Sequence, residues 1–205
     1  MTNTREQNFQ KYDGFTLVKD KIIMMFFGFI PKTFTPNHVT MVRLFMIPFI
    51  LYFLVIQNYE TSLILFVIAA FTDALDGAMA RTRNQITEWG KLFDPIADKI
   101  LIGSTGIILI VKFLNPLFAL ILIVIESLLI LLSFIENKRN KAKNIPHNIQ
   151  ANWSGKIKMF LQCVAIGFLI LYAIWPESSY LLVSEYSLLA SFLFAIISLV
   201  VYKSI

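Results

Sequence analysis

Charged residues are scarce in this chain of 205 residues. Asp, Glu, Lys and Arg together make up 15% of it, whereas ordinary soluble domains have about 25%. Hydrophobic residues make up 57%, and the mean hydropathy is +0.70. This balance excludes a typical soluble globular protein and indicates a chain that lies in a membrane. Because backbone polar groups in lipid need partners within their own segment, we expect membrane-spanning helices.

Cysteine and histidine are also nearly missing. With Cys163 as its one cysteine, the chain cannot form an intrachain disulfide, and with only His38 and His147 a zinc site is not expected. The sequence lacks the G-x-x-x-x-G-K-[ST] loop that binds nucleotide triphosphates and the alternating acidic loop of EF-hands. Metal or nucleotide chemistry must therefore come from other residues.

The apolar residues fall into six long runs. We expect spanning helices over 37–56, 62–81, 90–112, 116–135, 153–175 and 186–202. The stretch 15–30 mixes three charged residues with Met and Phe and is too short to span, so it predicts an amphipathic helix at the membrane interface. The predicted organisation is an N-terminal cytosolic segment, 1–36, followed by one six-helix membrane domain, 37–205.

Basic residues indicate how the chain is oriented. If the N-terminus is cytosolic, nearly all of the 18 Lys and Arg residues lie in or beside cytosolic segments, while the turns on the other side hold only Lys112. This asymmetry predicts a multi-pass protein of the cell inner membrane with both termini in the cytosol. The formal net charge of +5 then reflects these loops, and nucleic acid is not an expected partner.

Four aspartates gather between the second and third apolar runs. Asp73 and Asp76 are three residues apart, and Asp94 and Asp98 are four apart, so each pair lies on one face of its helix. Because the two helices are consecutive and antiparallel, we expect the pairs to face each other at the cytosolic rim. Converging carboxylates repel one another, and a hard divalent cation such as Mg²⁺ or Mn²⁺ is the best counter-charge.

Small residues and an arginine accompany the acids. Gly77 follows Asp76 directly, and Arg81 lies one turn beyond it on the same face. A glycine notch admits a bulky group to the backbone, and a guanidinium grips phosphate in two bonds. The pattern predicts a site for a metal-bound pyrophosphate. Two other interpretations remain open: an intramembrane cation path, as in a transporter, and, for Asp94 alone, a helix cap before Pro95.

The stretch from Asp73 to Asp98 reads D-x-x-D-G-x-x-A-R, then eight residues, then G-x-x-x-D-x-x-x-D. It resembles the signature of the CDP-alcohol phosphotransferase family at every fixed position, and the six-run pattern resembles that family over almost the whole chain. The resemblance implies an integral-membrane enzyme, usually a homodimer, whose site opens to the cytosol. Such enzymes move a phosphatidyl or similar group from a CDP-linked donor, such as CDP-diacylglycerol, to an acceptor hydroxyl and release CMP.

The resemblance also implies residue roles. Asp73, Asp76 and Asp94 would bind a pair of Mg²⁺ or Mn²⁺ ions, and Asp98 would complete the metal site and act as the general base. Arg43 is a further candidate for the nucleotide. The residues expected to line the cytidine diphosphate pocket are Asn37, Thr40, Gly77, Ala80, Arg81 and Gly90.

The stretches "GKLFDPIADKIL" and "GKIKM" resemble phosphatidylglycerophosphate synthases, which use glycerol 3-phosphate. Lys156, Lys158 and Arg139 are the expected contacts of a phosphorylated acceptor, although lysines here also serve as ordinary cytosolic anchors. The sequence departs from those synthases in the fourth run. There Ile125 precedes Glu126 where they have an Arg-Glu pair, and the next arginine is Arg139. The acceptor therefore stays open between glycerol 3-phosphate and another polar alcohol, such as inositol phosphate or serine.

Overall fold

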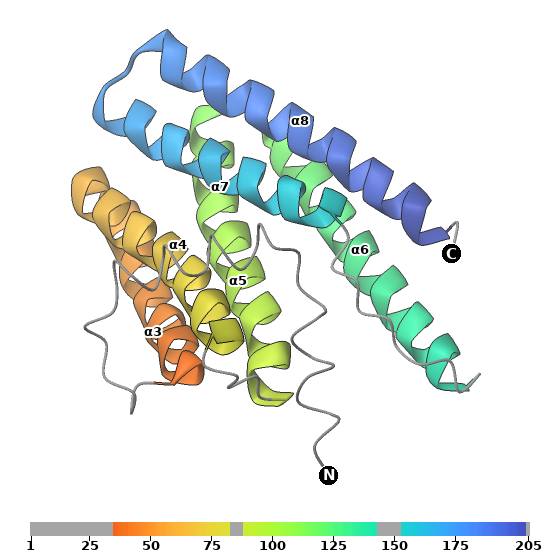
Figure 1. Ribbon diagram of the computed structural model, residues 1–205. Coiled ribbons are helices and arrows are strands. Elements are labelled where there is room, and N and C mark those ends of the chain that lie inside the picture. The colour runs from red at the N-terminus through yellow and green to blue at the C-terminus, as the bar shows by residue number, and fades with distance from the viewer. Residues whose placement is uncertain (1–34, 83–87, 143–152, 204–205) are drawn as a thin grey trace. The chain divides into compact units, whose positions relative to one another are not determined.

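The computed structural model describes residues 35–82, 88–142 and 153–203, and every regular element in these ranges is an α-helix (Figure 1). The expected interfacial helix over 15–30 lies outside the described residues and stays a prediction. The described helices, each overlapping one of the six predicted runs, are α3 (Pro36–Val55), α4 (Tyr59–Thr82), α5 (Glu88–Phe113), α6 (Pro116–Ala142), α7 (Trp153–Ile174) and α8 (Ser178–Lys203).

Polar caps fix where helices begin. Asn58 precedes α4, and its Oδ1 accepts a hydrogen bond from the Thr61 amide at 3.2 Å. Asn115 precedes α6, and its Oδ1 accepts from the Leu117 amide at 2.9 Å. Such caps satisfy amide groups that have no partner in the first turn of a helix. Because Asn58 supplies one, α4 begins at Tyr59, three residues before the start expected from hydropathy.

Two helices extend well beyond the predicted apolar runs. Helix α6 continues to Ala142 through the polar sequence that follows residue 135, and α8 begins at Ser178 rather than near residue 186. Glu, Lys, Arg and Ala favour helix strongly, so the polar end of α6 stays helical where hydropathy falls. Hydropathy therefore predicted the apolar part of each helix better than its ends.

The chain divides into two compact units. The first comprises Met1–Phe49 and Leu65–Leu101, so that its described part holds the beginning of α3, the later part of α4 and the first part of α5. Its buried side chains come from all three helices: Val39, Ile47, Phe66, Ala69, Leu75, Met79, Ala97 and Leu101. The predicted acidic residues all belong to this unit.

The second unit comprises Ile50–Ile64 and Ile102–Ile205. Within it α7 and α8 lie side by side over most of their length (Figure 1). The buried face of α8 alternates at intervals of three and four residues: Ser184, Leu188, Ser191, Ala195 and Ser198. Small residues let helix backbones approach closely, which is how helices associate in lipid. On α5, a Cβ placed on Gly106 would lie 3.4 Å from Ile166 of α7, so these helices are also in contact.

The surface of the described helices is apolar. Exposed large hydrophobic residues follow helical spacing, as at Met41, Phe45 and Phe49 of α3. Such a surface is more stable in contact with lipid hydrocarbon than with water. Among the described residues, α3, α7 and α8 are long and apolar enough to cross a membrane. The chain is therefore an all-α integral membrane protein, while the count of six spans remains a prediction.

Candidate functional site

The first unit places a charged side chain in its interior. Helix α3 buries Val39, Thr40, Arg43 and Ile47 along one face, and the Arg43 side chain is completely buried. A charge is removed from solvent at high cost unless it is paired and hydrogen-bonded. Arg43 therefore needs anionic partners from neighbouring helices.

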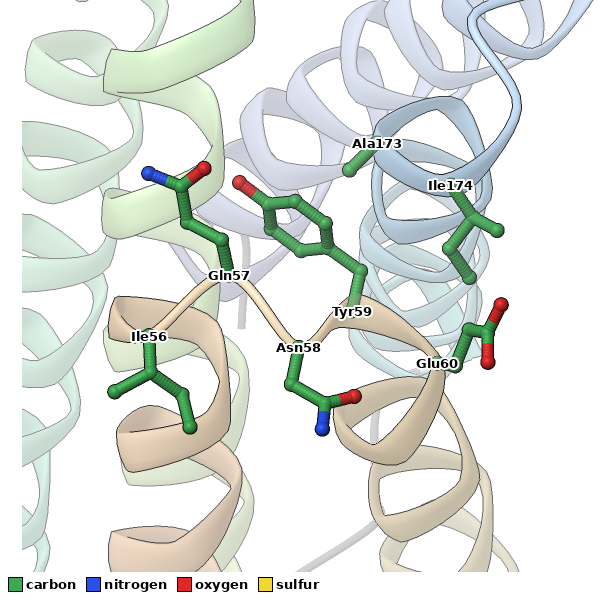
Figure 2. A pocket seen from close by; sticks show the side chains of 7 residues that line it. All are labelled: Ile56, Gln57, Asn58, Tyr59, Glu60, Ala173 and Ile174. Carbon is green, nitrogen blue, oxygen red and sulfur yellow. The ribbon is translucent and has the colours of Figure 1, made fainter.

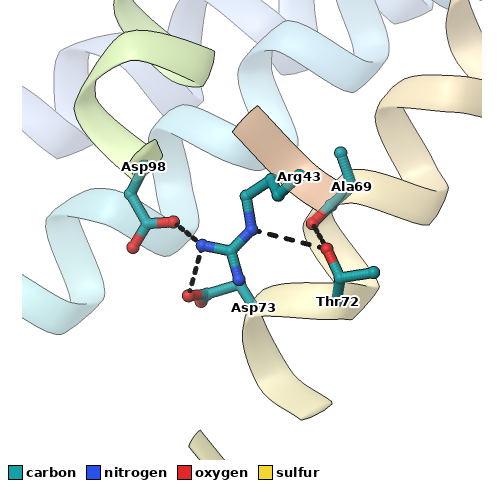
Figure 3. A network of polar contacts seen from close by, with 5 residues as sticks. All are labelled: Arg43, Ala69, Thr72, Asp73 and Asp98. Carbon is teal, nitrogen blue, oxygen red and sulfur yellow. Dashed lines mark hydrogen bonds and ion pairs between the residues drawn. The ribbon is translucent and has the colours of Figure 1, made fainter. Parts of the chain in front are cut away.

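Asp73 of α4 and Asp98 of α5 supply those partners. Arg43 Nη1 donates to Asp73 Oδ1 at 3.1 Å and also to Asp98 Oδ1 (Figure 3). Arg43 Nε lies 3.4 Å from Thr72 Oγ1, which itself donates to the Ala69 carbonyl at 2.6 Å. The guanidinium thus ties three helices together. We call Arg43, Asp73 and Asp98 the arginine–aspartate cluster.

The cluster is unbalanced in charge and open on one side. Counted over these three described side chains alone, two carboxylates and one guanidinium carry a formal charge of −1 when all are ionised. The Asp73 side chain is 49% exposed, the Asp98 side chain 13% and the Arg43 side chain 0%. A cation from solvent therefore reaches the carboxylates at the Asp73 side of the cluster, while the arginine is inaccessible to solvent.

The donor set suits a hard divalent cation. Both Oδ1 atoms reach the same nitrogen, so they lie within two hydrogen-bond lengths of each other. Carboxylate oxygens are the ligands that Mg²⁺ and Mn²⁺ prefer. Asp73 and Asp98 therefore fit as two of the four predicted ligands. In the part of the chain that the structure describes, no group of three or more His, Cys, Asp or Glu side chains comes together.

Other predicted site residues are placed only by their backbone. The structure puts Asp76, Gly77, Ala80 and Arg81 in α4, within two turns or so of Asp73, and puts Gly90 and Asp94 in the first turns of α5. Their side chains lie outside the description, so their roles stay predictions. Asn37 and Thr40 lie in the first turns of α3, half-buried and buried respectively, on the helix that carries Arg43.

A second buried ion pair lies in the second unit. Lys158 Nζ of α7 donates to Glu126 Oε1 of α6 at 2.5 Å, and Gln162 Nε2 donates to the same oxygen at 3.0 Å. The Lys158 side chain is 7% exposed and that of Glu126 23%. We call these residues the lysine–glutamate cluster. Lys156 is exposed, and Arg139 belongs to α6 with its side chain outside the description.

The sequence pattern predicts an acidic site but not the arginine that joins Asp73 to Asp98. The sequence offers Arg43 only as a further candidate for the nucleotide, and a divalent cation is the expected counter-charge for the acids. One signal was available: Arg43 interrupts an apolar run, and a cation in such a helix needs a partner. The pairing of Lys158 with Glu126, and the role of Gln162, were not foreseen either, although Glu126 stood out as an acid inside an apolar run.

A hollow of about 480 Å³ lies in the second unit, at the turn between α3 and α4 and beside the end of α7 (Figure 2). Tyr59 lies on its wall, and the Tyr59 hydroxyl accepts a hydrogen bond from Lys112 at 2.6 Å. Glu60 is the one acid on the wall, and no predicted site residue is among the lining residues, which are Ile56, Gln57, Asn58, Tyr59, Glu60, Ala173 and Ile174. The hollow is open and has none of the paired acids that the predicted chemistry requires.

Comparison with known proteins agrees with the sequence pattern. Residues 33–201 match the CDP-alcohol phosphatidyltransferase family. Among curated relatives, the CDP-diacylglycerol–glycerol-3-phosphate 3-phosphatidyltransferase of Rickettsia typhi is 34% identical over 139 residues, which cover 66% of this chain and 75% of the relative. The enzyme of the same name from Wigglesworthia glossinidia brevipalpis is 33% identical over 173 residues, covering 82% and 91%. That of Bacillus subtilis is 30% identical over 152 residues, covering 67% and 76%.

Proposed function

The chain belongs to the CDP-alcohol phosphatidyltransferase family and is a transferase, and from this premise we propose that it moves the phosphatidyl group of CDP-diacylglycerol to glycerol 3-phosphate and releases CMP. The observation that carries the proposal is the convergence of Asp73 and Asp98 on one buried guanidinium. These are the first and last acids of the motif that marks the family, and they come from different helices.

The acceptor is proposed from the relatives. Those named above carry glycerol 3-phosphate in their names, and the match to them extends over two thirds or more of the chain for the Wigglesworthia and Bacillus enzymes. Lys156, Lys158 and Arg139 are the proposed contacts of the acceptor phosphate. Lys158 is held by Glu126, so we propose that it acts from a fixed position, whereas exposed Lys156 adds a less directional charge.

The reaction requires a proton acceptor and a place for the diphosphate. The acceptor hydroxyl oxygen attacks the phosphatidyl phosphorus, the bond from that phosphorus to the bridging oxygen breaks, and CMP leaves with this oxygen. We assign Asp98 as the base that takes the hydroxyl proton. Asp73, Asp76, Asp94 and Asp98 would hold a pair of Mg²⁺ or Mn²⁺ ions, whose chemistry when bound is to neutralise charge on the pyrophosphate and on CMP.

The remaining proposals concern the nucleotide and the placement of the site. Asn37, Thr40, Gly77, Ala80, Arg81 and Gly90 are the proposed lining of the cytidine diphosphate pocket, with the guanidinium of Arg81 on the diphosphate. We propose six spans with both termini and the site on the cytosolic side, an N-terminal segment 1–36 ahead of the membrane domain 37–205, and a homodimer. The charge asymmetry of the sequence supports the orientation.

A direct assay tests the function. The purified full-length protein in detergent would be supplied with CDP-diacylglycerol, Mn²⁺ or Mg²⁺, and separately with glycerol 3-phosphate, inositol phosphate, serine or glycerol. We expect CMP and phosphatidylglycerophosphate with the first acceptor, and loss of both with a chelator or with Asp98→Asn. The matched control is Glu60→Gln, which changes an exposed acid of α4 and should leave the rate unchanged.

Each alternative outcome points elsewhere. CMP release with another acceptor would replace glycerol 3-phosphate but keep the family chemistry. Absence of CMP release with every acceptor, together with metal-dependent ion flux into proteoliposomes, would overturn the proposal in favour of a cation transporter.

A further inference from the structure

We propose that Arg43 is a positioning residue. Its buried guanidinium holds the carboxylates of Asp73 and Asp98 close together and in fixed orientations, so that the two can bind a divalent cation. The inference rests on the proposed function for the identity of the ion. It concerns a residue that contacts the carboxylates, not one that contacts the reacting atoms. The observations that carry it are the burial of Arg43 and its contacts with Asp73, Asp98 and Thr72.

The geometry constrains the guanidinium at two points. Nη1 serves both carboxylates, while Nε lies against Thr72 Oγ1 at 3.4 Å. The Thr72 hydroxyl is itself directed, because it donates to the Ala69 carbonyl one turn back in α4. A planar guanidinium held in this way gives its donors fixed directions. The positions of the two Oδ1 atoms are therefore coupled to each other through Arg43.

Bonding to Arg43 and bonding to a metal are compatible in one carboxylate. An ionised carboxylate has two oxygens and about four lone-pair sites, so one group can accept from a guanidinium and also ligate an ion. Ligating carboxylates in metal sites are commonly held by such outer partners, and removal of a partner typically weakens metal affinity about 10- to 100-fold. Arg43 occupies the place of such a partner for both acids.

The alternative is that Arg43 is a stand-in cation, which the metal displaces. The two readings predict opposite signs. Removing a stand-in cation makes the cluster more negative and tightens metal binding, whereas removing a positioning residue lets the carboxylates separate and weakens it. The exposures favour positioning, because Asp73 is half exposed while Arg43 is wholly buried. An ion arriving from solvent meets the carboxylates before it meets the arginine.

The test measures binding of Mn²⁺ alone, without donor or acceptor, to the full-length protein in detergent by electron paramagnetic resonance. We expect Arg43→Gln to weaken Mn²⁺ affinity by about 10- to 100-fold and Arg43→Lys to give an intermediate loss, since lysine keeps the charge but not the planar fork. Lys112→Gln changes an exposed lysine of the second unit with no proposed role in the site and serves as the control, for which Mn²⁺ affinity should stay unchanged.

A second variant keeps the test informative if Arg43→Gln does not fold. Thr72→Val removes the oxygen beside Nε but leaves every charge in place, and we expect it to weaken Mn²⁺ binding several-fold. Unchanged or tighter Mn²⁺ binding in Arg43→Lys and Thr72→Val overturns the inference, as does tighter binding in Arg43→Gln. Absence of Mn²⁺ binding by the wild-type protein overturns it too.

The test separates this inference from the proposed function. If the Arg43 and Thr72 variants weaken Mn²⁺ binding but wild-type protein releases no CMP with any acceptor, the function fails and the role of Arg43 stands. If these variants bind Mn²⁺ as wild type does while wild-type protein forms phosphatidylglycerophosphate, the role of Arg43 fails and the function stands.

Discussion

The arginine–aspartate cluster and the lysine–glutamate cluster are both buried ion pairs between helices, but they differ in charge balance. Arg43 faces two carboxylates, one of which is half exposed. Lys158 faces one carboxylate, to which Gln162 adds a neutral donor. Counted over its three named side chains, the first cluster has a formal charge of −1 and an acid that is 49% exposed. The Lys158–Glu126 pair is neutral, and its acid is 23% exposed.

This difference bears on which ligand each cluster attracts. A charge-matched pair attracts a free cation less than a cluster with an excess carboxylate does, and hydrophobic residues of similar volume often replace such a pair without loss of stability. A cluster with an excess carboxylate attracts a cation and is stabilised when one binds. The same kind of interaction thus holds α6 to α7 in one unit, and in the other leaves a charge for chemistry.

The largest expected effect comes from Asp98→Asn. Loss of a general base typically lowers a rate about 100- to 10,000-fold, and this change also removes a charge from the proposed metal site. We expect kcat for CMP release to fall at least about 100-fold, measured with saturating CDP-diacylglycerol and glycerol 3-phosphate. The melting temperature of the variant is the control for folding. A variant with near wild-type kcat would remove Asp98 from the chemistry.

Arg43→Met tests how much the guanidinium of the arginine–aspartate cluster contributes to stability. It leaves Asp73 and Asp98 facing each other without the guanidinium, and breaking a buried pair costs about 3–5 kcal/mol. Because Asp73 is half exposed, we expect a loss near the lower end, about 3 kcal/mol, in the free energy of unfolding measured in mixed micelles with chelator present. An unchanged free energy of unfolding would show that the cluster does not hold the three helices.

The balanced cluster should behave differently under double substitution. Glu126→Gln leaves the Lys158 ammonium without an anion, and we expect a loss of about 2 kcal/mol, because Glu126 is partly exposed and the amide oxygen still accepts hydrogen bonds. The double variant Lys158→Met with Glu126→Leu should recover to within about 1 kcal/mol of wild type. A double variant less stable than Glu126→Gln would show that hydrophobic residues cannot replace the Lys158–Glu126 pair, which contradicts the proposed difference between the clusters.

The smallest effect is expected at exposed Lys156. An exposed charge contributes about 0.2–1 kcal/mol, which corresponds to at most about a five-fold change in an equilibrium constant. We expect Lys156→Gln to raise KM for glycerol 3-phosphate about two- to five-fold and to leave kcat unchanged in steady-state kinetics. Lys112→Gln, at an exposed lysine with no proposed role in catalysis, is the control. Equal KM values in the two variants would remove Lys156 from the acceptor site.

The sequence predicted the helices well because apolar runs follow local rules, and the same kind of rule led to the two acid pairs, whose roles stay predictions. Apolar runs identify helices in lipid, and a spacing of three or four residues places two acids on one face. The ends of α6 and α8 were less predictable, because helix propensity and capping continue beyond the apolar run. The Asn58 cap shows this on a small scale, since it moves the start of α4 to Tyr59.

The sequence predicted that acids of two consecutive helices face each other, but not which residue of a third helix pairs with them. Arg43 is 30 residues from Asp73 and 55 from Asp98, and periodicity within one helix does not say which residue of another helix lies opposite. The same limit hid the pairing of Lys158 with Glu126, 32 residues apart. Because every charge in an apolar helix needs a partner, only a few oppositely charged residues are candidates for each pairing. The packing of the helices decides which of them is the partner.

The arginine of α3 also bears on the order in which the protein is made. Residue 43 leaves the ribosome well before residue 98, so the first apolar helix meets the bilayer while its later partner is still unsynthesised. Arg43 is the eighth residue of the 20-residue α3, and an arginine costs about 2.5–3.5 kcal/mol at the centre of an inserted helix and less toward its ends. Helix α3 therefore gains its full tendency to stay in the membrane only after α4 and α5 have followed, which makes the assembly of the first three described helices a joint event rather than a succession of independent insertions.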